Sequence, residues 1–282
     1  MHKKISQEKD LPEISIESKE SLRRIDAFYQ INENNLEYIW KNGKIIDFKE
    51  GWPLSYHDQI NSNIYFILKG VARIIDKDNS DILITVCKLY TGDSIGLASI
   101  LRGEGCEQVS ASTDLKVFSL SDNQILNLYT KDNNFKSWCN KTIFPSEIAS
   151  LYKSSIQTYN IEMNDFIDIY PSLIDENKLK VINNVTIKAK EEIIFSGSKN
   201  VKDKDIGEII NQQVNITKDL KTDPRFICIN EKTLSQLKSK REEKILDSKI
   251  KQTNNSNSYS VDLPEISSLM VENDYQKIKN KI

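Results

Sequence analysis

Residues 63–76 read NIYFILKGVARIID and residues 81–90 read DILITVCKLY, and these two stretches decide the fold. Both are rich in β-branched and aromatic residues, and Gly70 divides the first into two runs of strand length. Similar runs lie at residues 44–49, 108–113 and 115–120. Turn sequences such as EGWP, KDNS and TGD separate the runs. The region lacks the crossover helices of a parallel sheet, so the pattern predicts a compact antiparallel barrel or jelly roll.

Helical patterns flank the predicted strands. Residues 16–42 place apolar side chains at helical spacing, and Gly43 follows as a helix end. After the last strand, Ser121 and Gln124 are spaced as a capping box, and Pro145 suits the first turn of a further helix. The predicted fold class is therefore mainly β with flanking helices (α+β).

The chain divides into four predicted parts. We expect a disordered tail at residues 1–15, a jelly-roll domain at 16–160, a small mixed α/β region at 161–237 and a polar, loosely ordered tail at 238–282. Within the mixed region, strands are expected at residues 192–196, 206–210 and 225–229.

A hexapeptide is repeated in the two terminal segments. The sequence DLPEIS occupies residues 10–15 and again residues 262–267. A shared docking peptide and a chance repeat are both open, and the biased composition favours chance.

Composition and charge exclude several classes of function. The 39 Lys and Arg residues nearly balance the 41 Asp and Glu residues, so the overall field attracts neither nucleic acid nor acidic lipid. The sequence has no apolar run of membrane-spanning length and no signal peptide, which favours a cytoplasmic protein that reaches the inner membrane only through a partner. Four scattered cysteines and two histidines predict no metal centre, no disulfide framework and no catalytic triad. We therefore expect a protein that is not an enzyme.

The segment at residues 89–112, LYTGDSIGLASILRGEGCEQVSAS, carries the functional information. With GVARIID before it, this segment resembles the cyclic-nucleotide-binding domain family, and the resemblance covers residues 40–155. In that family a jelly roll carries a phosphate-binding cassette, where a G-D-x-[FI]-G-E turn opens a short helix and an Arg precedes a V-x-A strand. The residues that match are Lys69 to Arg73, Gly92, Asp93, Ile95, Gly96, Val109 and Ala111. The resemblance implies that backbone N–H groups at the helix start hold a cyclic phosphate.

Two ligand-binding groups of that family are missing here. Leu97 stands at the position of the Glu that accepts the ribose hydroxyl, and the position of the phosphate-binding Arg falls near Gly105 or Cys106. Losing two charge-assisted hydrogen bonds should lower affinity roughly a hundredfold to ten-thousandfold. We therefore expect no cofactor, with a cyclic nucleotide as the alternative. The residues that would line this degenerate site are Gly96, Leu97, Ala98, Arg102, Cys106 and Gln108.

Arg102 offers another source of positive charge for an anion. Glu104 and Glu107 flank the same loop, however, and would repel an anion by a similar amount. The favoured interpretation of these three residues is a solvated turn with local ion pairs. Cys106 is expected to be a plain small side chain rather than a redox sensor, because only Arg102 is basic near it in sequence.

A narrower resemblance suggests a partner. The run ILRGEGCEQVSAS, the Trp138–Cys139 pair and the stretch FPSEIASLY are similar to the degenerate domain at the N-terminus of certain bacterial peptide-exporting ABC transporters, which also contain a cysteine-peptidase-like domain. The pieces IIFSG, DIGEII and DPRFICI extend this similarity to about residue 237. The chain contains no peptidase nucleophile motif and no nucleotide-binding phosphate loop. The resemblance implies a regulatory or docking module that acts with a transporter subunit.

Two other functions stay open as alternatives. The first is a sensor that binds a cyclic nucleotide or small anion through the Gly96 turn and Arg102. The second is a transcription regulator of the cyclic-AMP-receptor type. The second is disfavoured because Pro145 interrupts the expected long helix and residues 160–282 show no helix-turn-helix with a basic face.

Overall fold

A computed structural model describes residues 12–77, 83–159, 161–184, 192–211 and 214–238. The described residues belong to one compact unit that ends at Lys238. The polar tail expected at residues 238–282 lies outside this range except for Lys238. Of the tail expected at residues 1–15, residues 12–15 are described, and Ile14 is buried.

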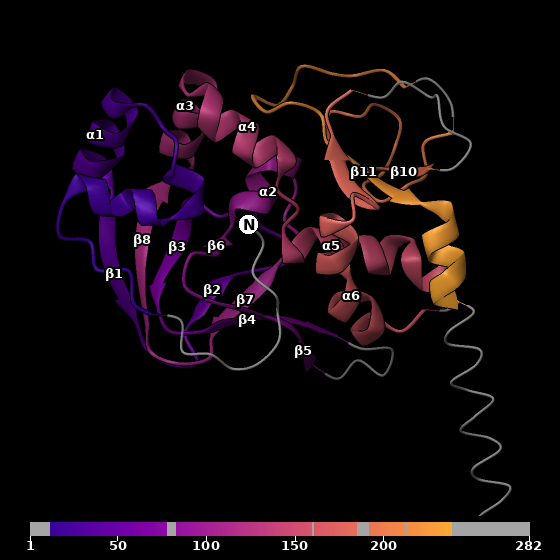
Figure 1. Cartoon of the computed structure of the whole chain (residues 1–282), viewed down its shortest axis with the longest axis horizontal. Coiled ribbons are helices and arrows are strands. Elements are labelled where there is room, and N and C mark those ends of the chain that lie inside the picture. Colours follow the sequence, from indigo (N-terminus) through magenta and orange to yellow (C-terminus); the bar gives the residue numbers. More distant parts are fainter. Residues whose placement is uncertain (1–11, 78–82, 160, 185–191, 212–213, 239–282) are drawn as a thin grey trace, which may run out of the picture. The chain divides into compact units, whose positions relative to one another are not determined.

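Two four-stranded antiparallel sheets form a jelly roll. One sheet has the order β1-β8-β3-β6 and the other β2-β7-β4-β5. The first contains β1 (Lys44–Phe48), β8 (Leu115–Ser121), β3 (Asn63–Lys69) and β6 (Ser94–Ile95), and Figure 1 shows β1, β8 and β3 side by side. The second contains β2 (Pro53–Ser55), β7 (Gln108–Ala111), β4 (Ala72–Lys77) and β5 (Leu83–Leu89). The predicted fold class, mainly β with flanking helices, is confirmed.

Alternation along the strands gives the first sheet two buried faces. On β3, Ile64, Phe66 and Leu68 join one apolar cluster, whereas Ile67 joins another. Successive side chains point to opposite faces of a strand, so this sheet separates two cores. The strands β2 and β6 were not predicted, because two or three residues are too few to show alternation.

The helical N-terminal segment and the helices after β8 cover one face of the first sheet. The segment contains the 3-10 turns η1 (Lys19–Arg24) and η2 (Asp26–Phe28) and the helix α1 (Glu33–Asn42), and α3 (Asp122–Lys131) and α4 (Asn133–Lys141) follow β8. The Phe28 ring lies 4.6 Å from that of Phe66 on β3 and 6.1 Å from that of Phe135 on α4. These aromatic contacts attach the N-terminal segment to the barrel.

Three predicted helix boundaries are confirmed, one for a different reason than expected. Ser121 and Gln124 form the capping box of α3, and Pro145 is the first residue of α5 (Pro145–Ser154). Gly43 ends α1 with φ −76°, which any residue adopts. A Cβ atom at Gly43 would lie 2.1 Å from Phe118 Cζ, so close packing requires the glycine.

The C-terminal part adds a turn, a helix and a third sheet. These elements are η3 (Ile156–Tyr159), α6 (Met163–Asp175), β9 (Leu179–Ile182), β10 (Glu192–Ser196) and β11 (Phe226–Asn230), and the sheet order is β10-β11-β9. The strand predicted at 192–196 is confirmed, and the one predicted at 225–229 lies one residue later. The strand predicted at 206–210 is wrong, because within it only Ile209 forms a ladder contact, an isolated bridge to Phe195.

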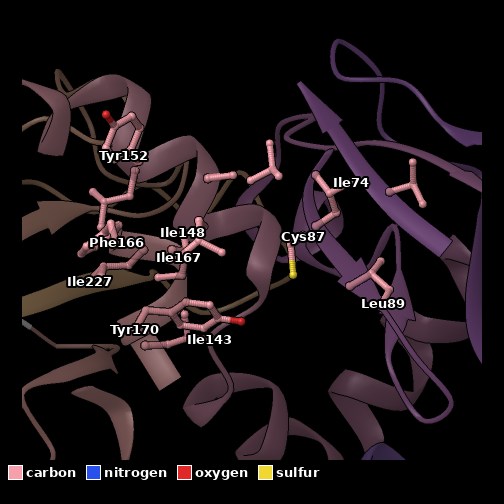
Figure 2. Close-up of a cluster of buried hydrophobic side chains, with 14 of the residues drawn as sticks. Ile74, Cys87, Leu89, Ile143, Ile148, Tyr152, Phe166, Ile167, Tyr170 and Ile227 are labelled. Atoms are coloured by element: carbon pink, nitrogen blue, oxygen red, sulfur yellow. The ribbon is translucent and has the colours of Figure 1, made fainter. Parts of the chain in front are cut away.

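One apolar cluster joins the second sheet of the jelly roll to the C-terminal part. Figure 2 shows Ile74 and Cys87 of the strands facing Ile148 of α5 and Phe166 and Tyr170 of α6. All five side chains are buried. Burying apolar surface at this junction stabilises the C-terminal part on the barrel. Among the described helices, none combines the length and hydropathy needed to cross a bilayer.

Candidate functional site

The predicted site residues lie on the segment from β6 through the short helix α2 (Leu97–Arg102) to Gln108, which we call the cassette. Gly96 caps the helix with φ +88°, a left-handed conformation that favours glycine. A Cβ atom at Gly96 would also lie 2.9 Å from Ile64 Cδ1. The local sequence therefore builds the turn that the family resemblance implied, with the Gly96 N–H turned toward Glu107.

The carboxylate of Glu107 occupies the Gly96 turn. Its Oε1 atom accepts a short hydrogen bond from the Gly96 N–H, and the Ser146 hydroxyl also hydrogen bonds to this carboxylate. Glu107 is 3% exposed. Burial raises the pKa of Glu107 to about 7, against the lowering effect of these hydrogen bonds. The protein thus supplies one of its own carboxyl groups to the Gly96 backbone N–H, the group that the resemblance implied for a phosphate.

The other predicted site residues pack into protein rather than around an open pocket. Leu97, Ala98 and Cys106 are at most 4% exposed and belong to the apolar cluster beneath the N-terminal segment. The Cys106 N–H donates to Ser99 Oγ at 3.2 Å, and burial raises the pKa of its thiol. Gln108 is half-buried on β7, opposite Ile75 of β4. Gly96, Leu97, Ala98, Arg102 and Cys106 are thus placed together in one structural unit, and Gln108 begins the adjoining strand.

Arg102 and Glu107 are buried, which overturns the predicted solvated turn. Arg102 is 3% exposed, and its Nη2 atom donates to Ser150 Oγ at 3.0 Å. Its Nε and Nη1 atoms have no hydrogen-bond partner among the described residues. Only Glu104 behaves as expected for a solvated turn, since it is partly exposed and pairs with Lys199 at 2.5 Å. The wrong prediction rested on the general rule that charged residues lie at the surface.

Helix α5 provides polar contacts to both sides of the cassette. Ser146 hydrogen bonds to Glu107, and Ser150 accepts from Arg102. These two serines are four residues apart, so they share one face of the helix. Glu147 lies between the two serines in the sequence, and its side chain is fully buried. The helix that begins at Pro145 therefore connects the cassette to a second buried charge.

The buried partner of Glu147 is Arg225, which was not among the predicted site residues. Its Nε and Nη2 atoms donate to the two carboxylate oxygens of Glu147, each at 2.9 Å. Its guanidinium also donates to the carbonyls of Cys139 and Thr142 at 2.7 and 2.8 Å. These carbonyls lie at the C-terminal end of α4, where they have no partner within the helix. Arg225 thus caps α4 and neutralises Glu147 in the first turn of α5.

The chain around Arg225 also holds the C-terminal end of the cassette helix. Thr222 Oγ1 donates to the Leu101 carbonyl at 3.1 Å, and the Lys199 N–H donates to the Arg102 carbonyl at 2.8 Å. The final carbonyls of α2 are satisfied in this way by residues about one hundred positions later in the sequence. The local signal that could have marked Arg225 is a charged residue directly before the apolar run FICI, which begins a buried strand.

The described residues of the cassette form a packed structural unit. Within the described residues, no three His, Cys, Asp or Glu side chains cluster as metal ligands. The four cysteines are buried and unpaired. Burial raises the pKa of Cys87 and of Cys228 to about 12, which keeps both as unreactive thiols.

Several solved structures are similar to this chain. No family model matches it, and no curated protein matches it either. A cyclic nucleotide-binding protein from Geobacter metallireducens is 16% identical, over 43% of this chain and 87% of its own length, with a TM-score of 0.37. The regulatory domain of Toxoplasma gondii protein kinase A, crystallised with cyclic AMP, is 13% identical, over 81% of this chain and 97% of its own length, with a TM-score of 0.39.

A further similar structure is the regulatory subunit of a cyclic-AMP-independent protein kinase A from Trypanosoma brucei. It is 16% identical, over 42% of this chain and 47% of its own length, with a TM-score of 0.34. Likenesses at this level assign neither a ligand nor a role to this chain.

Proposed function

We propose that this chain is a non-enzymatic regulatory or docking module, built on a cyclic-nucleotide-binding-like domain whose cassette is closed by its own carboxylate. The observation that carries the proposal is the hydrogen bond from the Gly96 N–H to Glu107, in a turn whose side chains are buried. Such a module acts by binding other proteins and does not act as a sensor of a free nucleotide.

Electrostatics and hydrogen bonding both oppose a cyclic nucleotide in this cassette. A phosphate that approached Gly96 would meet the buried Glu107 carboxyl group, which already accepts the Gly96 N–H and, above its pKa of about 7, carries a negative charge that repels the phosphate. Leu97 provides no acceptor for a ribose hydroxyl, and its side chain is fully buried. The ligand would have to expel Glu107 and would gain neither of the two charge-assisted bonds that normally hold it.

We further propose a peptide-export ABC transporter as the partner. The support is the similarity of residues 100–112, Trp138–Cys139 and residues 144–152 to the N-terminal domain of such exporters. The test is a pull-down in which the full chain is the bait and a purified exporter is the prey. A stable complex would support the proposal, and failure to form one with any peptide exporter would contradict it.

One observation favours a second candidate function, a sensor of a small anion. The Nε and Nη1 atoms of Arg102 are buried and have no hydrogen-bond partner in the part of the chain that the structure describes, and such donors are the groups that bind a phosphate. In this alternative Glu107 would leave Gly96 and an anion would take its place between Gly96 and Arg102.

Calorimetry distinguishes the two candidates. Cyclic AMP and cyclic GMP are titrated into the full chain, into Glu107→Gln and into Arg102→Ala. The closed cassette predicts no saturable heat for the unmodified chain. Micromolar binding that Arg102→Ala abolishes would replace the closed-cassette proposal with the sensor. Glu107→Gln controls for charge, because it keeps the shape of the side chain and removes its negative charge.

A further inference from the structure

The short segment Pro12–Ser15 occupies a defined site on the first sheet of the jelly roll. The strand pairing between β3 and β8 shifts between Ile67 and Lys69, which leaves Leu68 as the extra residue of a β-bulge. A bulge residue lacks a partner in the ladder, and the Leu68 carbonyl instead accepts the N–H of Ile14 at 2.9 Å. The bulge therefore creates a backbone acceptor for an incoming peptide.

Side chains at this site select two consecutive residues. Glu13 forms ion pairs with Lys69 and Lys116, each at 3.0 Å, and these two lysines are register partners across β3 and β8. Their ammonium groups, first Lys69 and then Lys116, hold the pKa of the Glu13 carboxyl below its usual value. The next side chain, Ile14, is 7% exposed within the apolar cluster that contains Leu68. The site thus binds a peptide in which an acidic residue is followed by a large apolar residue.

The occupant of this site is part of the repeated hexapeptide. Pro12, Glu13 and Ile14 correspond to Pro264, Glu265 and Ile266 in the second DLPEIS sequence. The second sequence lies outside the described residues, and its six amino acids are identical to those of the first. Glu13 and Ile14, the described side chains of the first copy that contact the site, have identical counterparts in Glu265 and Ile266, which favours the docking peptide over the chance repeat.

We propose that the site formed by Leu68, Lys69 and Lys116 recognises the sequence DLPEIS, and that residues 262–267 compete with residues 10–15 for it. The two copies differ directly after the hexapeptide, where Ile16 is replaced by Ser268. Ile16 adds a partly buried contact to the same apolar cluster. The first copy therefore binds more tightly, and the second enters when the first is displaced.

The experiment measures binding of a fluorescent peptide that spans residues 260–269. The acceptor is the full chain with both copies weakened by Glu13→Ala, Ile14→Ala, Glu265→Ala and Ile266→Ala, and a thermal melt checks that it folds. We expect saturable binding that is about tenfold tighter than to the unmodified chain, whose site is occupied. A peptide of scrambled sequence is the matched control, and it should not bind.

Reversing the charges of the two lysines and of the peptide glutamate tests whether peptide binding depends on these ion pairs. Lys69→Glu with Lys116→Glu in the weakened chain should lower the affinity about tenfold, and the Glu265→Lys peptide should recover it. Both lysine side chains are partly exposed, so these substitutions are compatible with folding. Equal binding of the scrambled peptide, or binding indifferent to the charge exchange, would overturn the proposal. Absence of binding to a folded weakened chain would overturn it as well.

Discussion

Arg225 donates to both carboxylate oxygens of Glu147 at 2.9 Å, although 78 residues separate the two in the sequence. Neither side chain is more than 1% exposed. The pair connects the loop before β11 to the first turn of α5. The same helix contacts Glu107 through Ser146 and Arg102 through Ser150. The C-terminal part is thus attached to the cassette by specific buried charges as well as by apolar packing.

Replacing Arg225 should strongly destabilise the chain. Arg225→Met leaves the Glu147 carboxylate buried without its cation, and breaking such a pair costs about 3–5 kcal/mol. Arg225→Lys should fail to restore stability, because an ammonium cannot form the two parallel bonds of a guanidinium. Urea unfolding gives the free energies. Lys49→Ala, which breaks an exposed pair with Asp114, is the control and should cost less than about 1 kcal/mol. Equal losses for Arg225→Met and Lys49→Ala would contradict this account.

Replacing Arg102 should have a much smaller effect, although it is also buried. Among the described residues, its Nε and Nη1 atoms have no hydrogen-bond partner, so the folded state already bears the desolvation cost of these donors. Arg102→Met removes that cost along with one hydrogen bond to Ser150, and the unfolding free energy should change by less than about 1 kcal/mol. A loss as large as that of Arg225→Met would show that Arg102 has partners in solution.

The titration of Glu107 should make stability depend on pH. Its pKa is about 7 in the folded state and 4.5 for the free group. Between these two pH values the folded chain therefore keeps a proton on Glu107 that the unfolded chain has released. Stability from this group is therefore greatest below pH 4.5 and is lost as the pH rises through about 7. The loss is on the order of 3 kcal/mol. Glutamine does not titrate, so the unfolding free energy of Glu107→Gln minus that of the unmodified chain should grow from pH 5 to pH 8, as measured by urea unfolding. A difference that is constant with pH would be inconsistent with a buried titrating carboxyl.

Placing a glutamate at position 97, where the family that the cassette resembles has one, should damage the fold rather than create a binding site. Leu97 is fully buried in an apolar cluster, where an unpaired carboxylate costs several kcal/mol. Leu97→Glu should therefore lower the melting temperature substantially. The control is Leu83→Glu on β5, since Leu83 is 58% exposed and a surface change typically costs less than about 1 kcal/mol. A Leu97→Glu chain as stable as this control would show that the position faces solvent.

The sequence allowed the jelly roll to be predicted because its long strands show their structure locally. The runs at residues 63–69 and 115–120 alternate between two buried faces, and the capping box at Ser121 is complete within four residues. The N-terminal segment was less predictable. Its apolar side chains have helical spacing, but the chain forms two 3-10 turns before the Asn32 side chain caps α1 through the Asn35 N–H.

The buried charges could not be predicted, because their burial depends on distant parts of the chain. Glu107 is buried by Ser146 and its neighbours on α5, and Glu147 is buried by Arg225. Each of these side chains, taken in its local sequence, fits an exposed position. Their partners come together only when the third sheet packs beside α5. The local sequence gives a signal only at Arg225, which directly precedes the apolar run FICI, and it does not identify Glu147 as the partner.

The closed cassette is tested most directly by the amide resonance of Gly96 in ¹⁵N-labelled protein. Because this N–H donates to Glu107, the resonance should titrate with that carboxyl and should move in Glu107→Gln. We expect it to stay in place when excess cyclic AMP is added. A saturable shift of the Gly96 amide with cyclic AMP would contradict the account, because it would mean that the nucleotide displaces Glu107.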